Sequence, residues 1–498
     1  MIARRSRIGA IAASLAVSAC TVGPTYHQPP LPAPAAFART TPAPAPGAPP
    51  AAGDLAAWWD SFNDPMLTYL VRQALAANPD LETAASRVRQ ARTQIVTARA
   101  AELPTLSASG DTVDFNSNHQ SSSASASSSS AAASGAAAGA SSGLGLPIPS
   151  TLHLYSAGFD ATWEVDLFGG VRRRIEQAKA SEQAAVWAMR DVQVSLVAEV
   201  ASDYLTLRLT QARIAVGEAE LQRQKDIGGV VAARRKTGFV TNLDVYQQNV
   251  QVEMAAAQIP QLQAQAETEV HAIAVLLGQT PESLDQLLQA PANPLPPDPP
   301  ALPAGLPSQL LERRPDVREA ERQLAAANAN IGVQTANLFP KLNLLGLASF
   351  ASTSASNLFS SDNFATIGVG MISQPVFDAG KTHAAIKAAK EQQRQALFAY
   401  RKAGLGALQN VEDALSKYTA DAARRDSLRR SLASTSNSLT LAQDQYRVGL
   451  VAFINVIQSE NAQLNARDQY VQADGAVLSD LVALYKALGG GWSDAARA

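Results

Sequence analysis

The stretch NPDLETAASRVRQARTQIVTARAAELPTLSASG, residues 78–110, decides the fold because a second version of it occurs later in the same chain. The second version, RPDVREAERQLAAANANIGVQTANLFPKLNLLG, occupies residues 314–346 and aligns without a gap at a shift of 236. The matched positions are Pro79 and Pro315, Asp80 and Asp316, Ile95 and Ile331, Pro104 and Pro340, Leu106 and Leu342, and Gly110 and Gly346. Self-similarity at a fixed spacing indicates a repeated structural unit. The chain is therefore predicted to be an internal two-fold repeat.

The match continues further along the chain at a second shift of 211. The matched positions there are Gly169 and Gly380, Ile175 and Ile386, Lys179 and Lys390, Gly238 and Gly449, and Val245 and Val456. The smaller shift places 25 extra residues in the first half, before Gly169. A tract of only Ser, Ala and Gly at 121–142 accounts for most of them, and 120–143 is interpreted as a loop insertion. Chance similarity among alanine-rich helices is the alternative, and two gapless alignments with matched Pro and Gly argue against it.

Each repeat is predicted to contain a helix, two strands, a long helix, a turn and a last helix. The first repeat places them at 80–103, 104–115, 152–164, 170–236 and 241–277, and the second repeat has strands at 340–351 and 364–377 and helices at 381–447 and 452–488. A proline in the first turn starts the first helix of each repeat, and another proline ends it. At 1.5 Å per residue the long helix would measure about 100 Å, so the two shorter helices could stack end to end beside it.

Apolar residues recur every seven positions along both long helices. They are Val200, Leu207, Ile214 and Leu221 in the first repeat, and Leu432, Leu439 and Tyr446 in the second. This spacing is typical of coiled coils. An ordinary amphipathic helix is the alternative in windows this short.

The predicted strands alternate apolar and polar residues, most clearly over 152–164. A transmembrane β-strand shows this alternation. A half-buried strand of a soluble sheet shows it as well. Four strands cannot close a transmembrane barrel, because the smallest barrels have about eight. Several copies of the chain would have to contribute, with eight strands from two copies or twelve from three.

Cys20 is the only cysteine of the 498 residues, and its surroundings explain why it is there. A basic start, an apolar run of about ten residues and the small residues Ser18 and Ala19 predict a signal peptide over 1–19. The sequence Val-Ser-Ala-Cys resembles a bacterial lipobox, so Cys20 is predicted to carry a covalent lipid. No other cofactor is expected. The remaining predicted divisions are a Pro/Ala-rich tether at 20–53, the repeats at 54–290 and 308–490 with β-hairpins at 104–165 and 340–377, a Pro-rich linker at 291–307, and a tail at 491–498.

Composition and motifs argue against several classes of function. The formal net charge is −2 and shows no excess of basic residues, which does not favour a nucleic-acid partner. The five histidines are scattered without the spacing of metal ligands. The chain has no phosphate-binding loop and no nucleophile-elbow pattern. It is therefore not expected to be an enzyme or to hold a metal.

These features together resemble the TolC-like outer membrane factors, and specifically the NodT-type efflux lipoproteins. The resemblance covers nearly all of 20–492. It is carried by CTVGPTY (20–26), DSFNDPML (60–67), NPDL (78–81), WEVDLFGG (163–170), TGFVTNLDV (237–245), RRPDVREAE (313–321), FPKL (339–342), PVFDAG (375–380), YRVGLVAFINV (446–456) and YKALGGGW (485–492).

The resemblance implies an α+β membrane protein that assembles as a homotrimer. Each protomer would give four strands to a 12-stranded transmembrane β-barrel, which a long α-helical coiled-coil barrel continues into the periplasm. The implied location is the outer membrane of a Gram-negative bacterium. The implied function is the passive exit channel of a tripartite efflux system for drugs or other small molecules. The implied partners are a periplasmic adaptor (membrane fusion) protein and an inner-membrane transporter of the RND type. A lipid-anchored periplasmic coiled-coil tether or scaffold without a channel is the alternative.

The resemblance also implies two kinds of functional residue. The adaptor would contact two helix–turn–helix tips, formed by Thr237, Gly238 and Phe239 and by Val448, Gly449 and Leu450. A periplasmic gate would be formed by Ile454, Asn455, Gln458 and Asn461, with Tyr446 and Asp244 bridging the helices. Well-known members of the family carry aspartates at the gate, and this chain has amides and an isoleucine. Because a ring of amides neither focuses cations nor titrates, the sequence predicts weak cation selectivity.

Overall fold

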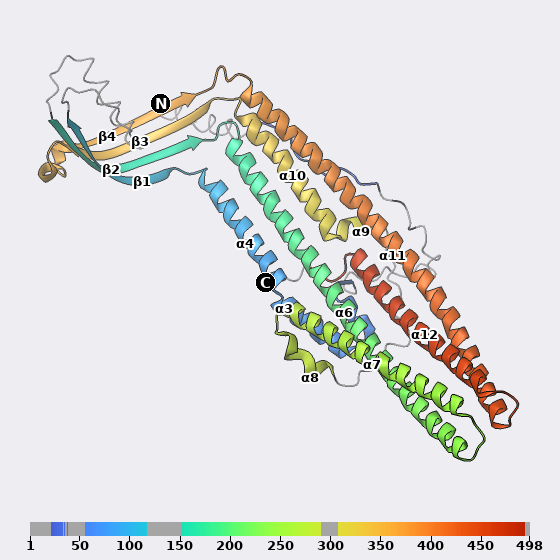
Figure 1. The fold of residues 1–498 in the computed structure, drawn as a ribbon. Helices are drawn as coiled ribbons and strands as arrows, with labels where there is room; N and C mark the ends of the chain where they lie inside the picture. The colour runs from blue at the N-terminus through green and yellow to red at the C-terminus, as the bar shows by residue number, and fades with distance from the viewer. Residues whose placement is uncertain are drawn as a thin grey trace. The chain divides into compact units, whose positions relative to one another are not determined.

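A computed structural model describes residues 21–32, 34, 37, 55–116, 151–289 and 307–493. The elements are η1 (Trp58–Phe62), α3 (Pro65–Ala77), α4 (Pro79–Ala100), β1 (Thr105–Asn116), β2 (Thr151–Val165), α6 (Gly170–Lys236), α7 (Asn242–Leu276), η2 (Pro281–Leu284), α8 (Asp285–Leu288), α9 (Pro307–Arg313), α10 (Pro315–Ala336), β3 (Lys341–Ser352), η3 (Ala355–Asn357), η4 (Ser361–Asn363), β4 (Phe364–Ser373), α11 (Lys381–Arg447) and α12 (Phe453–Ala487). Figure 1 shows them along the chain.

Two compact units divide the chain, and each draws on both halves of the sequence. The first contains Met1–Thr25, Gln94–Ala178 and Asn328–Glu391, and the second contains Tyr26–Thr93, Lys179–Ala327 and Gln392–Ala498. The first unit holds all four described strands. The second holds the helix–turn–helix tips, so strand and tip residues belong to different units.

The sheet of the first unit is antiparallel and has the strand order β1-β2-β3-β4. Strands lie close to their predicted positions, but β4 ends at Ser373 and not at residue 377. The pairing stops there because Ser373 lies opposite Lys341, and the residue before Lys341 is Pro340. Proline has no N–H group to donate to a strand ladder.

The helices of the two halves have matching lengths. Helices α6 and α11 each contain 67 residues, and α7 and α12 each contain 35. The bounds of α6 and α11 are those predicted from the sequence, and those of α7 and α12 differ from the prediction by one residue at each end. Among the described residues, no helix is both long enough and apolar enough to cross a membrane.

Within the second unit, short helices stack end to end as their lengths predict. Asn78 joins α7 to α4, because its Nδ2 donates to the carbonyl of Leu276 at 2.8 Å and its Oδ1 accepts from the first turn of α4. Arg314, at the equivalent position of the second repeat, donates from Nη1 to the carbonyl of Ala487 at 2.9 Å. Both side chains therefore satisfy a carbonyl that a helix end would otherwise leave unpaired.

The main core of the second unit forms where η1, α3, α6, α7, η2, α8 and α12 meet. Its largest fully buried side chains include Trp58, Leu67, Tyr204 and Leu481. The Tyr204 hydroxyl donates to Oδ2 of Asp64 at 2.6 Å, and the other oxygen of Asp64 caps α3. The cap and the core thus fix the start of α3 together.

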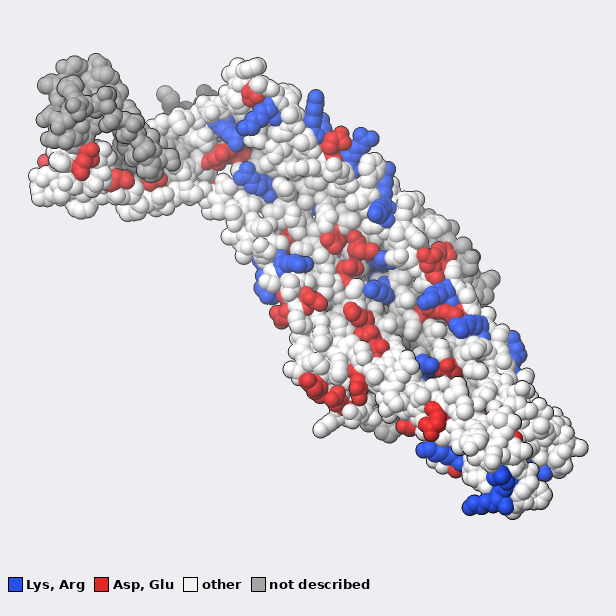
Figure 2. All heavy atoms as spheres, viewed as in Figure 1, with Lys and Arg blue, Asp and Glu red and all other residues white. Residues whose placement is uncertain are grey.

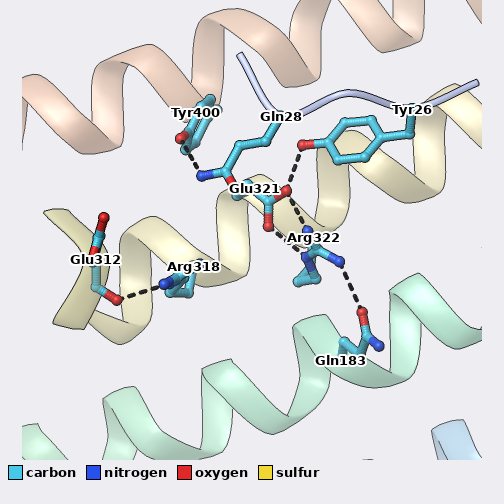
Figure 3. A network of polar contacts seen from close by, with 8 residues as sticks. All are labelled: Tyr26, Gln28, Gln183, Glu312, Arg318, Glu321, Arg322 and Tyr400. Atoms are coloured by element: carbon cyan, nitrogen blue, oxygen red, sulfur yellow. Dashed lines mark hydrogen bonds and ion pairs between the residues drawn. The ribbon is translucent and has the colours of Figure 1, made fainter. Parts of the chain in front are cut away.

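Part of the predicted tether lies against helices, as Figure 3 shows. The Tyr26 hydroxyl donates to Oε1 of Glu321 on α10 at 2.5 Å, and Glu321 also pairs with Arg322. Gln28 donates from Nε2 to the hydroxyl of Tyr400 on α11 at 3.3 Å. Burial, followed by the hydrogen bond to Glu321, raises the pKa of Tyr26. The N-terminal segment is therefore fixed to α10 and α11 by specific polar contacts.

Candidate functional site

Two turns end the long helices, and both use the same backbone geometry. We call 237–239 the first tip and 448–450 the second tip. Gly238 has φ 80° and Gly449 has φ 79°, values that glycine adopts without strain. At the first tip the Phe239 N–H donates to the carbonyl of Arg234 at 3.0 Å, and at the second the Leu450 N–H donates to that of Gln445 at 2.9 Å. A glycine followed by this bond is the Schellman ending of a helix.

Apolar side chains project from both tips into solvent. Phe239 is 82% exposed, Val448 70% and Leu450 75%. An open pocket of about 840 Å³ lies between the tips. Its lining includes the predicted tip residues Thr237, Phe239, Val448 and Gly449, together with the predicted bridging residues Asp244 and Tyr446. The structure thus brings residues from both repeats around one concave surface.

Three cationic residues directly precede the first tip. Arg234, Arg235 and Lys236 form the last turn of α6. Figure 2 shows Lys and Arg gathered at this end of the helices. The guanidinium of Arg234 lies 5.0 Å from the ring centre of Tyr446, which is within the range of a cation–π contact between the repeats.

Asp244 and Tyr446 share the pocket, but their functional groups have different surroundings. Asp244 accepts hydrogen bonds from the N–H and the hydroxyl of Thr241, both at 2.8 Å, in a capping box at the start of α7. The Tyr446 hydroxyl is buried and has no hydrogen-bond partner among the described residues. Its ring packs against Phe453, with the ring centres 5.3 Å apart.

The predicted gate residues lie in the first turns of α12. Ile454, Asn455 and Gln458 are exposed, and Asn461 is partly buried. Their spacing places them along one face of the helix. None of the four lines the pocket between the tips.

The opposite face of α12 is apolar and buried. It contributes Phe453, Val456 and Ile457 to a cluster with Val231 of α6 and Leu439 of α11. The face with the predicted gate residues is therefore held in place by packing behind it.

A buried polar cluster lies close to the same part of α12, and its residues are not among those predicted from the sequence. Gln248 of α7 donates to Oε1 of Gln224 at 2.6 Å, and Gln224 donates to Oε1 of Glu220 at 2.6 Å. Glu460 of α12 is 2% exposed. Burial, followed by the charge of Glu220, raises the pKa of Glu460, while Gln224 and Arg223 act in the opposite direction.

A sequence signal for this cluster exists. Phe453, Val456, Ile457 and Glu460 recur at the three- and four-residue spacing of one helix face. A carboxylate in an otherwise apolar stripe indicates a buried charge that needs partners.

The family model described as "Outer membrane efflux protein" matches residues 70–279 and 306–490. The chain belongs to the outer membrane efflux protein family. The matched residues include both tips, both long helices and all four predicted gate residues.

Several members of this family are similar along most of their length. The pyoverdine export outer membrane protein OpmQ of Pseudomonas aeruginosa is 30% identical over 89% of this chain and 88% of its own. The cation efflux system protein CusC of Escherichia coli is 30% identical over 96% of this chain and 97% of its own. The solved outer-membrane channel OprN has a TM-score of 0.84 and 34% identity, and it covers 95% of this chain and 100% of its own. These relatives are outer-membrane efflux proteins and channels.

Two predictions concern residues that the structure does not describe. Cys20, the predicted lipid attachment site, lies outside the described residues, as does the 120–143 insertion. Among the described residues, no group of His, Cys, Asp and Glu is arranged to hold a metal ion.

Proposed function

We propose that this protein is the outer-membrane exit channel of a tripartite efflux system, which passively conducts drugs or other small molecules out of the periplasm. The observation that supports it best is the arrangement of the tips. Two exposed turns from different repeats border one pocket, and three of the four predicted gate residues of α12 are exposed directly after the second turn. A passive channel needs no catalytic group, and its conduction depends on such residues.

The assembly that fits this function is a homotrimer with a 12-stranded β-barrel and a periplasmic coiled-coil barrel. The four-stranded sheet supports it, because β1 and β4 each have an edge without a neighbour in the described chain. Unpaired strand edges in a membrane would leave N–H and C=O groups unsatisfied. Pairing with further copies of the chain would satisfy them.

The proposed partners are a periplasmic adaptor at the tips and an inner-membrane RND transporter that supplies the energy. A covalent lipid on Cys20 would anchor the chain to the outer membrane. The named exports of the relatives range from pyoverdine for OpmQ to cations for CusC, so no single substrate follows for this chain. The amide-rich gate is proposed to give weaker cation selectivity than a ring of aspartates.

Two single-cysteine variants separate a channel from a periplasmic scaffold. Ser360→Cys lies in the exposed connection between β3 and β4, and Leu450→Cys lies at the second tip. Cells carrying either variant are treated with a membrane-impermeant thiol reagent, before or after lysis. The channel predicts that Ser360→Cys reacts in intact cells and that Leu450→Cys reacts only after lysis. If both react only after lysis, the chain is a periplasmic scaffold and the proposal is wrong.

A further inference from the structure

A buried carboxyl group lies beside the predicted gate residues of α12. Glu460 is 2% exposed, and its Oε1 has no hydrogen-bond partner among the described residues. In the sequence it stands between Gln458 and Asn461, which are both less buried and belong to the predicted gate. A charge that is buried without a partner is strongly unfavourable. This carboxyl group therefore needs either a cation or a proton.

The neighbours of Glu460 supply one cation for two carboxyl groups. The charges that act on Glu460 are those of Glu220 and Arg223 on α6. Arg223 already pairs with Glu220, because its Nη1 lies 3.0 Å from Oε2 of that residue. Helix α7 contributes the amide of Gln248, and α11 contributes Leu439 to the neighbouring apolar cluster. A proton is therefore the simplest partner for Glu460.

Amide groups between α6 and α7 fix the first of the two carboxyl groups. Gln248 donates from Nε2 to the carbonyl oxygen of Gln224 at 2.9 Å and to its Oε1 at 2.6 Å. Gln224 donates in turn to Oε1 of Glu220 at 2.6 Å. Both amide side chains are buried. Glu220 thus has the partners of an ionised acceptor, and Glu460 is the group that must take the proton while α12 lies against α6.

We propose that Glu460 is a proton-operated latch, which holds α12 against α6 while its carboxyl group is protonated and releases α12 when that group ionises. This inference rests on the proposed channel function, because the released helix carries the predicted gate. A protonated carboxyl group is neutral and can both donate and accept a hydrogen bond, so it fits the buried position. An ionised one repels Glu220 and gains hydration only when α12 moves away.

The latch would make the gate respond to pH although the predicted gate residues do not titrate. With α12 against α6, burial and the charge of Glu220 raise the pKa of Glu460 above its ordinary value of 4.5. With α12 displaced into water, the pKa returns to that value. The attached state therefore binds the proton more tightly, and acid favours it. As the pH rises from 4.5 through the raised pKa, the ratio of displaced to attached α12 should increase by up to about tenfold per pH unit.

Conductance in planar bilayers, recorded as a function of pH, tests the latch. The unchanged protein should conduct more at alkaline than at acidic pH. Glu460→Gln keeps the size of the side chain and is always neutral, so its conductance should stay low at every pH. Glu220→Gln leaves Arg223 free to pair with an ionised Glu460, so the rise with pH should become weaker. Glu253→Gln replaces an exposed glutamate of α7 and should behave like the unchanged protein.

A second measurement follows the movement of α12 without conduction. Ser459 is half-buried beside the latch, and Ser459→Cys places a thiol there. The rate at which a thiol reagent labels the purified protein is divided by the rate for Ser459→Cys/Glu460→Gln, because the reactivity of any thiol rises with pH. The ratio should increase as the pH rises. The protein without Ser459→Cys reports any labelling of Cys20.

The outcomes separate this inference from the proposed function. If conductance rises with pH equally in the unchanged protein, Glu460→Gln and Glu253→Gln, Glu460 is not the latch. If the labelling ratio stays constant with pH in a protein that conducts, the latch is wrong while the channel function stands. If the labelling ratio rises with pH but the protein conducts no ions at any pH, the latch stands and the channel function fails.

Discussion

Helices α7 and α12 begin at equivalent positions of the two repeats, but their first turns are fixed in different ways. Thr241 caps α7 and forms a reciprocal capping box with Asp244. Ala452, the equivalent residue of the second repeat, gives α12 no side-chain cap. A Ser, Thr, Asn or Asp cap is worth about 0.5–2 kcal/mol relative to alanine.

The contacts between each helix and its neighbours also differ, with buried hydrogen bonds on α7 and apolar packing on α12. Gln248 of α7 is buried and hydrogen-bonded to Gln224 of α6. The start of α12 depends on Phe453, Val456 and Ile457, which pack in the apolar cluster. Apolar packing has no fixed direction, whereas a capping box specifies where each donor lies.

A duplicated backbone can therefore start equivalent helices in two different ways. The tips share their glycines and their Schellman bonds, because the turn itself requires them. The turn places no such requirement on the first turn of the helix that follows it, and α7 and α12 differ there. The predicted gate residues lie on α12, the helix whose start has apolar packing and no side-chain cap.

The largest expected effect comes from removing the main apolar contact at the second tip. Phe453 is 6% exposed, and a buried Phe→Ala change costs about 3–5 kcal/mol. Phe453→Ala should therefore lower the denaturant midpoint of the purified protein strongly. Because it loosens α12 behind the predicted gate, it should also raise conductance in planar bilayers.

Phe239→Ala at the first tip is the matched control. Phe239 is 82% exposed, so its replacement should change stability by no more than about 0.5 kcal/mol. Equal losses for the two variants would contradict the view that burial of Phe453 stabilises the second tip.

The next expected effect depends on pH and involves Glu460. Burial and the charge of Glu220 raise the pKa of Glu460 above its ordinary value of 4.5. The folded chain therefore keeps a proton that the unfolded chain has already released. As the pH rises from 4.5 through the raised pKa, this group lowers the free energy of unfolding, by about 1.4 kcal/mol per pH unit between the two pKa values.

Glu460→Gln removes this titration and keeps the size of the side chain. Its thermal midpoint should fall less than that of the unchanged protein as the pH rises through this window, and should be higher at neutral pH. Glu253→Gln replaces an exposed glutamate of α7 and serves as the control. If the thermal midpoints of all three proteins change with pH in parallel, the pKa of Glu460 is not raised in the folded protein.

The sequence predicted the secondary structure closely because its signals are local and repeated. Matched prolines begin α4 and α10, and matched glycines flank α6 and α11, including Gly238 and Gly449 in the two turns. The end of β4 was predicted too late, because it depends on where the pairing strand stops at Pro340. A strand end of that kind is set by a neighbour distant in sequence.

Less of the candidate site than of the secondary structure could be predicted from the sequence. The two turns follow from turn chemistry, because glycine stands at each of them, whereas the gate residues on α12 are predicted only from the resemblance to the family. The full cluster of Glu220, Gln224, Gln248 and Glu460 could not be predicted, because three helices contribute to it. The sequence signals only Glu460, as a carboxylate in an apolar stripe, and packing alone shows which polar residues of α6 and α7 lie close to it.

The smallest expected effect comes from giving the second tip the cap of the first. Ala452 has φ −72° and ψ 154°, an extended conformation close to that of Thr241, so a threonine fits the backbone. Ala452→Thr should let the new hydroxyl accept the N–H of Asn455 and raise the free energy of unfolding by about 1 kcal/mol. Thr241→Ala should lower it by a similar amount, and denaturant melts of both variants test the pair. No change in either would mean that neither first turn depends on its cap.

Adding Asn455→Asp to Ala452→Thr completes the box, since Asp244 is the equivalent residue of the first repeat. The carboxylate can accept the N–H of residue 452, and it also places one negative charge per copy among the predicted gate residues. If those residues line the conducting path, reversal potentials in asymmetric KCl should shift towards cation preference, while Ala452→Thr alone leaves them unchanged. A gain in stability without a shift in reversal potential would place the gate elsewhere, because the new charge would then lie outside the path of the ions.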